Sequence, residues 1–327
     1  MLDKAEVAQL KKVCEKLENP VELTLYQTEE SDFGRRLEDF VNEVGRLSQG
    51  KIRTVAGRPD FNVGIVPCFR IGNKECANIV YAAVPLGHQF SPFIHALERI
   101  GGKSSALLDD NLPAAGSEAE LQVLISEHCP HCPLVVKAAF LLSSKHSSIS
   151  SFVVDAAQFP EVTQQYGIKS VPATVLDRRL VLIGNVSADR LLELVAMRGT
   201  LKFEMEVVQS LIDTGRIPEA VGCLDQEAGR QVVLDLMQNP EFSKRLSGLV
   251  VIEKALDENP EVVRTLVPSL VGMLSNDDSR IRGDIADLLG KIGDPHVISK
   301  LEPLVSDSDP DVAEAAAEAI EELRKIQ

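Results

Sequence analysis

Leu121-Gln122-Val123-Leu124-Ile125-Ser126-Glu127-His128-Cys129-Pro130-His131-Cys132-Pro133 is the stretch of this 327-residue sequence that decides its fold. Its first six residues are mostly apolar and predict a buried strand, and the apolar spacing from Pro133 to Ser144 predicts a helix. Two cysteines therefore stand between a strand and a helix. A Cys-x-x-Cys pair in this context indicates either redox chemistry or metal binding.

The position of the pair predicts how each thiol reacts. Cys129 is expected at the N-terminus of the helix, where unpaired N–H groups and the helix dipole favour the thiolate. His131 can add positive charge or a hydrogen bond to that thiolate. We therefore expect Cys129 to be the ionised, attacking nucleophile and Cys132, one turn further in, to be the buried resolving thiol. Pro133 is expected near the fourth helical position, where its missing N–H costs nothing.

The alternative for the pair is half of a zinc site. A second Cys-x-x-Cys or His pair would be needed to complete it, and the sequence holds none. His128 and His131 could join the two cysteines around a metal, but crowding and helix geometry make that arrangement poor. The pattern therefore favours redox chemistry, and no metal site is expected.

A Val171-Pro172 dipeptide, about 40 residues after the cysteines, is the second element of the predicted site. An X-Pro bond before a hairpin strand is a candidate cis peptide. It would place the Val171 backbone beside the dithiol, free to pair with an extended substrate strand. We assign Pro172 and His131, with the two cysteines, to catalysis. Val171, Pro130 and His128 are assigned to substrate binding, although a solvated loop position explains His128 equally well.

The elements around the dithiol follow the order of one α/β fold. After the first strand and helix come another strand, a short helix, a strand hairpin and a last helix opened by Ser187 or Asp189. The further predicted ranges are Ile149–Asp155, Glu161–Tyr166, Pro172–Leu176, Leu180–Gly184 and a helix ending near Arg198.

A second copy of this fold is predicted upstream, at an offset of about 100 residues. Val21–Tyr26 aligns with the strand before the dithiol, and Val66-Pro67 falls close to Val171-Pro172. Glu29 and Asp32 then stand where the cysteines stand, so this copy has no dithiol. Its elements are predicted at Val7–Leu17, Val21–Tyr26, Leu37–Leu47, Lys51–Ala56, Val63–Ile71, Ile79–Val84 and Phe90–Ile100.

No strand pattern follows Gly199. A period of about 31 residues replaces it, since Ser275-Asn276-Asp277-Asp278 recurs as Ser306-Asp307-Ser308-Asp309. A weaker copy aligns Arg245-Leu246-Ser247-Gly248 with Arg280-Ile281-Arg282-Gly283. Each helical pair in such a repeat exposes an apolar face that only its neighbours cover, and the tail is similar to HEAT-like repeats.

Residues 1 to about 198 resemble the N-terminal domain of the alkyl hydroperoxide reductase flavoprotein subunit and the related tandem-thioredoxin protein disulfide oxidoreductases. The first copy carries the resemblance in Ala83-Val84-Pro85-Leu86-Gly87-His88-Gln89-Phe90, and the second in Cys129-Pro130-His131-Cys132-Pro133 and Val171-Pro172-Ala173. The inert copy of that family likewise lacks a dithiol. The resemblance implies Cys129 as the exchange cysteine and Cys132 as its partner.

In that family the domain relays electrons from a flavin-bound disulfide centre to a peroxiredoxin. This sequence departs from the family pattern twice. Gln89 stands where the family usually has Glu, so a carboxylate near the dithiol is lost. No Gly-x-Gly-x-x-Gly follows a strand, so no flavin or NAD cofactor is expected and a separate reductase or dithiol must supply electrons. A peroxiredoxin-like protein is one candidate partner.

The dipeptide between the cysteines points in another direction from the scaffold. The periplasmic oxidant DsbA has the same Cys-Pro-His-Cys, and its stabilised reduced form makes it strongly oxidising. The scaffold favours reduction and the dipeptide favours isomerase or oxidant character. Both directions stay open.

The fold class expected is α/β plus all-α: two tandem thioredoxin-like folds followed by a helical-repeat domain. The boundaries are residues 1–102 for the copy without a dithiol, a linker at 103–119, 120–198 for the copy with the dithiol, and 199–327 for the repeats. The polar linker could hold one short helix around Leu107–Asn111.

Charge and composition exclude several classes of partner. The net charge is −15, and from Gly199 onward 25 acidic residues face 13 basic ones. Such a tail repels phosphate, so no nucleic acid partner is expected, although the repeats could bind a protein. No apolar run is long enough for a membrane span, and the charged N-terminus lacks the apolar core of a signal peptide. The chain is therefore expected to be cytoplasmic.

The function expected is thiol–disulfide exchange on protein disulfides at Cys129. The alternative is a redox sensor or scaffold whose helical repeats bind a partner, with little turnover. The other cysteines (Cys14, Cys68, Cys76 and Cys223) are expected to be small buried hydrophobes, with Cys68 beside Pro67 the first exception to consider. His88 is expected to be a structural hydrogen-bonder between the two copies.

Overall fold

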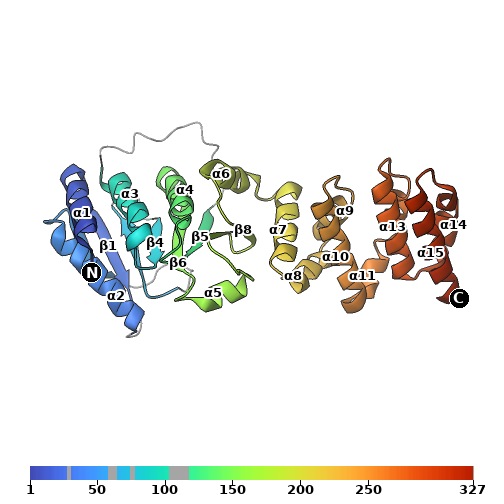
Figure 1. Ribbon diagram of the computed structural model, residues 1–327, viewed down its shortest axis with the longest axis horizontal. Helices are drawn as coiled ribbons and strands as arrows, with labels where there is room; N and C mark the ends of the chain where they lie inside the picture. Colours follow the sequence, from blue (N-terminus) through green and yellow to red (C-terminus); the bar gives the residue numbers. More distant parts are fainter. Residues whose placement is uncertain (28–30, 58–64, 74–77, 103–117, 327) are drawn as a thin grey trace. The chain divides into compact units, whose positions relative to one another are not determined.

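A computed structural model describes residues 1–27, 31–57, 65–73, 78–102 and 118–326. These residues form two compact units, Met1–Arg198 and Gly199–Gln327 (Figure 1). Most of the predicted linker, together with Glu29 and Cys76, lies outside the described residues.

The first half of the α/β unit has the predicted order of elements. A capping box at Asp3 and Glu6 starts its first helix, because each side chain accepts a backbone N–H of the other residue. The predicted strand over Val63–Ile71 begins only at Cys68, after Pro67, which has no N–H to give to a strand ladder. The elements are α1 (Lys4–Lys16), β1 (Val21–Tyr26), α2 (Asp32–Leu47), β2 (Ile52–Gly57), β3 (Cys68–Gly72), β4 (Ile79–Ala82), the 3-10 turn η1 (Gly87–Gln89) and α3 (Phe90–Gly101).

The second half repeats this order around the cysteines. Its dithiol helix begins at Cys132, so Pro133 is the second helical residue and not about the fourth. The residues before Cys132 form a turn instead, in which the Cys129 N–H donates to the Ser126 carbonyl at 3.1 Å. The elements are β5 (Ala119–Ile125), α4 (Cys132–Lys145), β6 (Ile149–Asp155), α5 (Pro160–Gln165), β7 (Ala173–Leu176), β8 (Leu180–Ile183) and α6 (Ala188–Met197).

Both halves share one eight-stranded sheet in the order β2-β1-β3-β4-β6-β5-β7-β8. Each half contributes one parallel pair and two antiparallel pairs, so the second half repeats the topology of the first. The halves join where β4 pairs in parallel with β6, in the register Ile79↔Ser151 to Ala82↔Val154 (Figure 1). The duplicated folds are therefore fused through backbone hydrogen bonds.

An aromatic cluster crosses this junction on one face of the sheet. Phe69 of β3 stacks on Tyr81 of β4, with ring centroids 5.3 Å apart. Phe93 of α3 packs edge-on against both rings, and Phe140 of α4 packs against Tyr81 at 5.5 Å. Because Phe140 belongs to the dithiol helix, the core of the inert half supports the active half directly.

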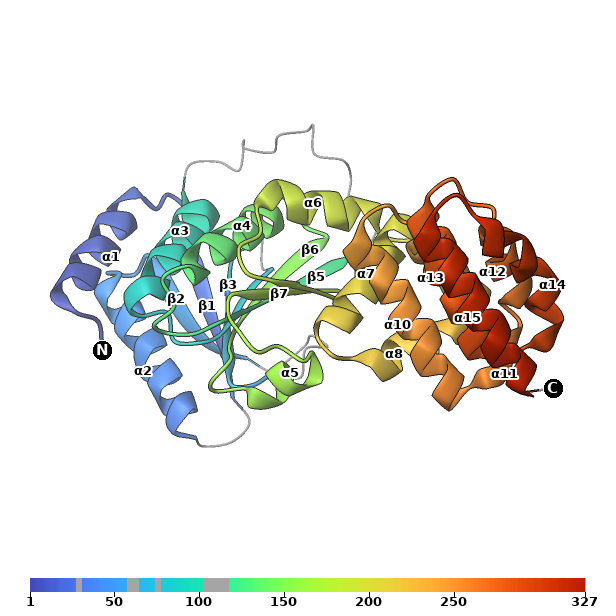
Figure 2. The ribbon, with the colours of Figure 1, turned by 45° about the vertical axis from the view of Figure 1, so that its right-hand side comes forward.

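The second unit consists of helices in its described residues, which end at 326 (Figure 2). Buried Leu, Ile, Val and Ala side chains line the contacts between neighbouring helices, and α13 packs closely on α15. The elements are α7 (Leu201–Asp213), α8 (Ile217–Gly222), η2 (Cys223–Asp225), α9 (Glu227–Met237), α10 (Phe242–Glu258), α11 (Pro260–Arg264), α12 (Val267–Met273), α13 (Ser279–Ile292), η3 (Pro295–Val297), α14 (Ile298–Leu301), η4 (Glu302–Ser306) and α15 (Pro310–Ile326).

Repeated polar contacts define the register of this unit. Arg245 donates to the Asn239 carbonyl and to Asp284, and Arg282 donates in the same way to the Asn276 carbonyl and to Asp307. Arg245 therefore corresponds to Arg282, two residues away from the weaker alignment predicted from the sequence. Side-chain hydrogen bonds of these long arginines, which sequence spacing does not reveal, decide the correspondence.

Candidate active site

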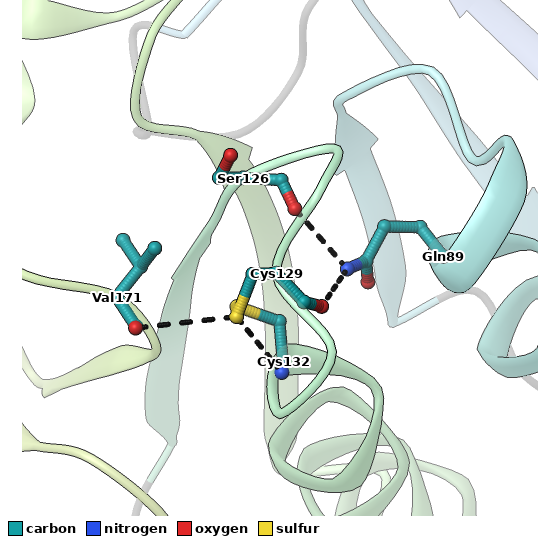
Figure 3. Close-up of a disulfide and its surroundings, with 5 residues drawn as sticks. All are labelled: Gln89, Ser126, Cys129, Cys132 and Val171. Atoms are coloured by element: carbon teal, nitrogen blue, oxygen red, sulfur yellow. Dashed lines mark hydrogen bonds between the residues drawn. A yellow bond between two sulfur atoms is a disulfide. The ribbon is translucent and has the colours of Figure 1, made fainter.

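The two cysteines of the dithiol differ sharply in exposure. They are joined by a disulfide, with their Cα atoms 5.6 Å apart (Figure 3). Cys132 is fully buried at the start of α4, whereas Cys129 in the preceding turn is partly exposed. Only Cys129 is open to attack by, or on, another molecule.

The start of α4 provides a hydrogen bond to the sulfur of Cys129. The Cys132 N–H donates to Cys129 Sγ at 3.1 Å. This N–H is one of the unpaired donors at a helix N-terminus, and the helix dipole adds partial positive charge there. Both effects favour a negative sulfur once the disulfide is reduced.

The surface around Cys129 combines polar and apolar groups. His128, Pro130 and His131 are all exposed, and the His131 side chain makes no capping hydrogen bond to α4. Leu134 is 63% exposed in the first turn of the same helix. Sequence reasoning did not single out Leu134, although an apolar residue directly after the cysteines and Pro133 was the available signal.

The Val171–Pro172 peptide is cis, as expected. The Val171 carbonyl oxygen lies 3.9 Å from Cys129 Sγ (Figure 3). Val171 precedes β7 and is partly exposed, whereas Pro172 is buried. The structure therefore brings a backbone segment outside the sheet ladder next to the accessible sulfur.

The equivalent position in the first half has the same backbone without the chemistry. Val66–Pro67 is also cis. Asp32 begins α2 as Cys132 begins α4, and the Ser31 hydroxyl caps α2 by accepting the Gly34 N–H. Cys68, beside the cis proline, is fully buried, and burial raises its pKa to about 12. A thiol held neutral in this way is a poor nucleophile.

Gln89 of the first half reaches the dithiol loop. Its side chain is buried, and Nε2 donates to the carbonyl oxygens of Ser126 at 3.3 Å and Cys129 at 3.5 Å (Figure 3). Oε1 is buried with no hydrogen-bond partner in the part of the chain that is described. The neighbouring His88 is exposed, so Gln89, and not His88, connects the two halves at this point.

A second contact from the first half adds charge near the loop. Arg36 of α2 forms an ion pair with Glu127, two residues before Cys129, at 3.4 Å. Asp155 lies at the end of β6, paired with Ile125, and burial raises the pKa of its carboxyl, while N–H donation from Ala157 opposes the rise. The electrostatic surroundings of the loop therefore depend on both halves.

The remaining cysteines of the described chain are not placed for exchange. Cys14 is buried, and its burial raises the pKa of its thiol. Cys223 is partly exposed in the helical unit, where it is not disulfide-bonded. Within the described ranges, no group of three or more His, Cys, Asp or Glu side chains could hold a metal ion. The same ranges contain no helix with the length and apolarity of a membrane span.

Two protein families match separate parts of the chain. The Thioredoxin domain family matches residues 119–196, and the HEAT repeats family matches residues 231–321. These ranges contain the dithiol with the cis proline, and the helices α10 to α14 with most of α15, respectively. Both matches agree with the fold class predicted from the sequence.

Known proteins resemble the first unit over its whole length. The F subunit of alkyl hydroperoxide reductase from Pseudomonas putida is 27% identical over 201 residues, which make up 59% of this chain and 37% of that protein. The N-terminal domain of the same reductase from Enterococcus faecalis is similar in structure over 60% of this chain and 100% of its own, with a TM-score of 0.52 at 22% identity.

A protein disulfide oxidoreductase from Aeropyrum pernix has the same fold over 61% of this chain and 95% of its own, with a TM-score of 0.51 at 18% identity. The chain thus spans about a third of the length of the reductase polypeptide that it matches in sequence. Together with the shared sheet and the dithiol, these likenesses identify a thioredoxin-like unit homologous to the N-terminal domain of the alkyl hydroperoxide reductase flavoprotein, joined to a region of HEAT repeats.

Proposed function

We propose that this protein catalyses thiol–disulfide exchange on protein disulfides at Cys129. One observation carries the proposal: the accessible sulfur of Cys129 is bonded to the buried sulfur of Cys132 and receives the first N–H of α4. A sulfur in this position can attack, and its neighbour is close enough to release whatever has been captured.

The reductive direction has two displacement steps. The Cys129 thiolate attacks one sulfur of the substrate disulfide, forms a mixed disulfide and expels the other substrate sulfur as a thiolate. Cys132, after losing its proton, attacks Cys129 Sγ, which closes the Cys129–Cys132 disulfide and releases the second substrate thiolate. The substrate gains two electrons and the dithiol loses two, so a separate dithiol or reductase must restore it.

The surface beside Cys129 fits an extended polypeptide. The Val171 backbone lies outside the sheet ladder and next to the sulfur, where a substrate strand could pair with it. Leu134, Pro130 and the histidines at 128 and 131 offer contacts for substrate side chains. Pro172 holds the Val171 carbonyl in place through the cis peptide.

The partners follow from the resemblance to the reductase flavoprotein. We propose a cytoplasmic relay that takes electrons from a separate reductase and passes them to a peroxiredoxin-like protein. This chain contributes the dithiol and needs no cofactor of its own for either step.

Substitution of each cysteine tests the exchange. Cys129→Ser should abolish the reduction of insulin disulfides by dithiothreitol-coupled turnover, because no accessible sulfur remains. Cys132→Ser should accumulate mixed disulfides at Cys129, because the resolving thiol is gone. Cys223→Ser, at a partly exposed cysteine in the helical unit, is the matched control and should keep full activity. Full activity in Cys129→Ser would disprove the proposal.

The HEAT repeats support a second candidate, a redox-sensing scaffold. In that case the repeats would bind a partner and the dithiol would turn over little. Disulfide-linked proteins recovered on Cys132→Ser from the native cells would favour the enzyme. A partner bound equally well by the oxidised and reduced chains, with no insulin reduction, would favour the scaffold.

A further inference from the structure

A groove of about 510 Å³ runs across three helices of the helical unit. It lies over α13, with the first turn of α10 on one side and the first turns of α15 on the other. The residues lining it are Phe242, Arg245, Ser279, Arg280, Gly283, Asp284, Asp287, Asp309, Asp311, Val312 and Ala315.

An exposed aromatic ring stands at one side of the groove. Phe242 is 62% exposed, and the Arg245 guanidinium lies over its ring, 5.5 Å from the centroid. Arg245 is itself held by Asp284 at 2.6 Å, so the ring rests on a fixed support. Leu246, one turn further along α10, is 43% exposed. Two large apolar side chains on one helix thus face solvent.

Carboxylates dominate the polar lining. Asp287, Asp309 and Asp311 line the groove together with Asp284, whereas only two arginines do. Both arginines are engaged, Arg245 by Asp284 and Arg280 by Asp278 outside the groove. Hydrogen bonds from the Ser279 side chain and the Asp311 N–H lower the pKa of Asp309, so this carboxyl is charged at neutral pH.

A glycine leaves the floor of the groove open. A Cβ built on Gly283 would meet only Val312 Cγ2, at 3.8 Å. Space is therefore available above α13 for a side chain from another molecule. The same geometry means that a large residue at this position would fill the groove without disturbing the helix contacts beneath it.

We propose that this groove docks a basic segment of a partner polypeptide. Lysine or arginine side chains of the segment would pair with Asp287, Asp309 and Asp311, and an apolar side chain would pack on Phe242. Charge complementarity selects this occupant, because the lining is acidic and the unit from Gly199 onward carries twelve more acidic than basic residues (25 against 13). The proposal goes beyond disulfide exchange and does not depend on it.

Peptide binding to the full chain tests the groove. The probe is a short, fluorescein-labelled, lysine-rich peptide with one leucine, followed by fluorescence anisotropy. Phe242→Ala should weaken binding about tenfold, as expected for an aromatic anchor. Asp287→Asn/Asp311→Asn should weaken it about fivefold at low salt and less at high salt. Gly283→Leu, which fills the groove, should abolish it.

Matched controls separate local contacts from the overall charge. Glu314→Gln/Glu318→Gln removes two exposed carboxylates of α15 that do not line the groove, and should leave binding unchanged. A peptide with glutamate in place of lysine should not bind. The proposal is overturned if the control variant weakens binding as much as Asp287→Asn/Asp311→Asn, or if Phe242→Ala and Gly283→Leu bind like the unaltered chain. The readout does not involve the dithiol, so it is independent of any failure of exchange activity.

Discussion

Gln89 places a neutral amide where it touches the dithiol loop. Its buried Oε1 lacks a hydrogen-bond partner among the described residues, and its Nε2 supports the Cys129 carbonyl. An amide neither takes nor gives a proton during exchange. The deprotonation of Cys132 must therefore depend on solvent or on the substrate, as far as this side chain is concerned.

Gln89→Glu should make the exchange rate depend on an additional ionisation. A carboxyl at this buried site would resist ionisation, and its titration should appear between about pH 5 and 8 in the profile of kcat/KM for insulin reduction. Gln89→Met, which has a similar size and no proton to exchange, should lose the loop contact without a new ionisation. Superimposable profiles for Glu and Gln would contradict the expected effect.

Leu134 offers a separate test of how a protein substrate is held. Leu134→Asn should raise KM for insulin several-fold, roughly the loss of one apolar contact, and should leave kcat nearly unchanged. The reduction of a small disulfide such as hydroxyethyl disulfide should not change, because a small molecule does not reach this surface. Equal effects on both substrates would show that Leu134 acts on the dithiol itself.

At the scale of elements, close contact between α13 and α15 holds the last repeat together. A Cβ added to Gly290 would lie 2.9 Å from the Cα and Cβ atoms of Ala319. Gly290→Ala should therefore lower the free energy of unfolding by about 1–3 kcal/mol, because the helices must move apart. Gly272→Ala in α12 is the matched control, since nothing lies within 4 Å of the added Cβ. It should be neutral or stabilise by up to about 1 kcal/mol in urea titrations.

An ion pair between α13 and the segment before α15 predicts how the unit responds to acid. Arg282 donates two hydrogen bonds to Asp307, at 2.8 and 2.7 Å. These bonds, followed by the Asp309 N–H, lower the pKa of Asp307 to about 2. Because this pKa is below the unfolded value of about 3.9, the stabilisation is present above pH 4 and is lost as the pH falls toward 2.

Thermal unfolding of Asp307→Asn should show this dependence. The difference in Tm between the unaltered chain and Asp307→Asn should be largest near pH 6 and should shrink as the pH falls toward 2. Glu318→Gln, at an exposed residue without a salt bridge in the described chain, should leave Tm nearly unchanged at pH 6. A constant difference for Asp307→Asn would mean that the pair contributes no pH-dependent stability.

At the scale of the whole α/β unit, the β4–β6 ladder predicts that the inert and active halves are stabilised together. Phe93 is fully buried in the aromatic cluster that reaches Tyr81 of β4. Phe93→Ala should cost about 3–5 kcal/mol and lower the hydrogen-exchange protection of β5 and β6 amides along with those of β1 and β3. If β5 and β6 kept their protection, the two halves would be independent in stability despite the shared sheet.

Much of this protein was determined by local patterns in the sequence. Alternating and continuous apolar runs predicted strands such as Val21–Tyr26 and Ile149–Asp155 with the bounds that the structure has. Cys-x-x-Cys and Val171-Pro172 predicted the two segments of the candidate site, because each is a short motif with its own chemistry.

Only the tertiary structure decided what these segments touch. The exposure of Cys129 against the burial of Cys132, the reach of Gln89 into the loop, and the pairing of β4 with β6 were all absent from the local patterns. The same holds for Arg282 and Asp307, which fix the register of the repeats. Periodicity records which face of an element is buried, but it does not record the partner that buries it, and at this site the partner comes from the half without a dithiol.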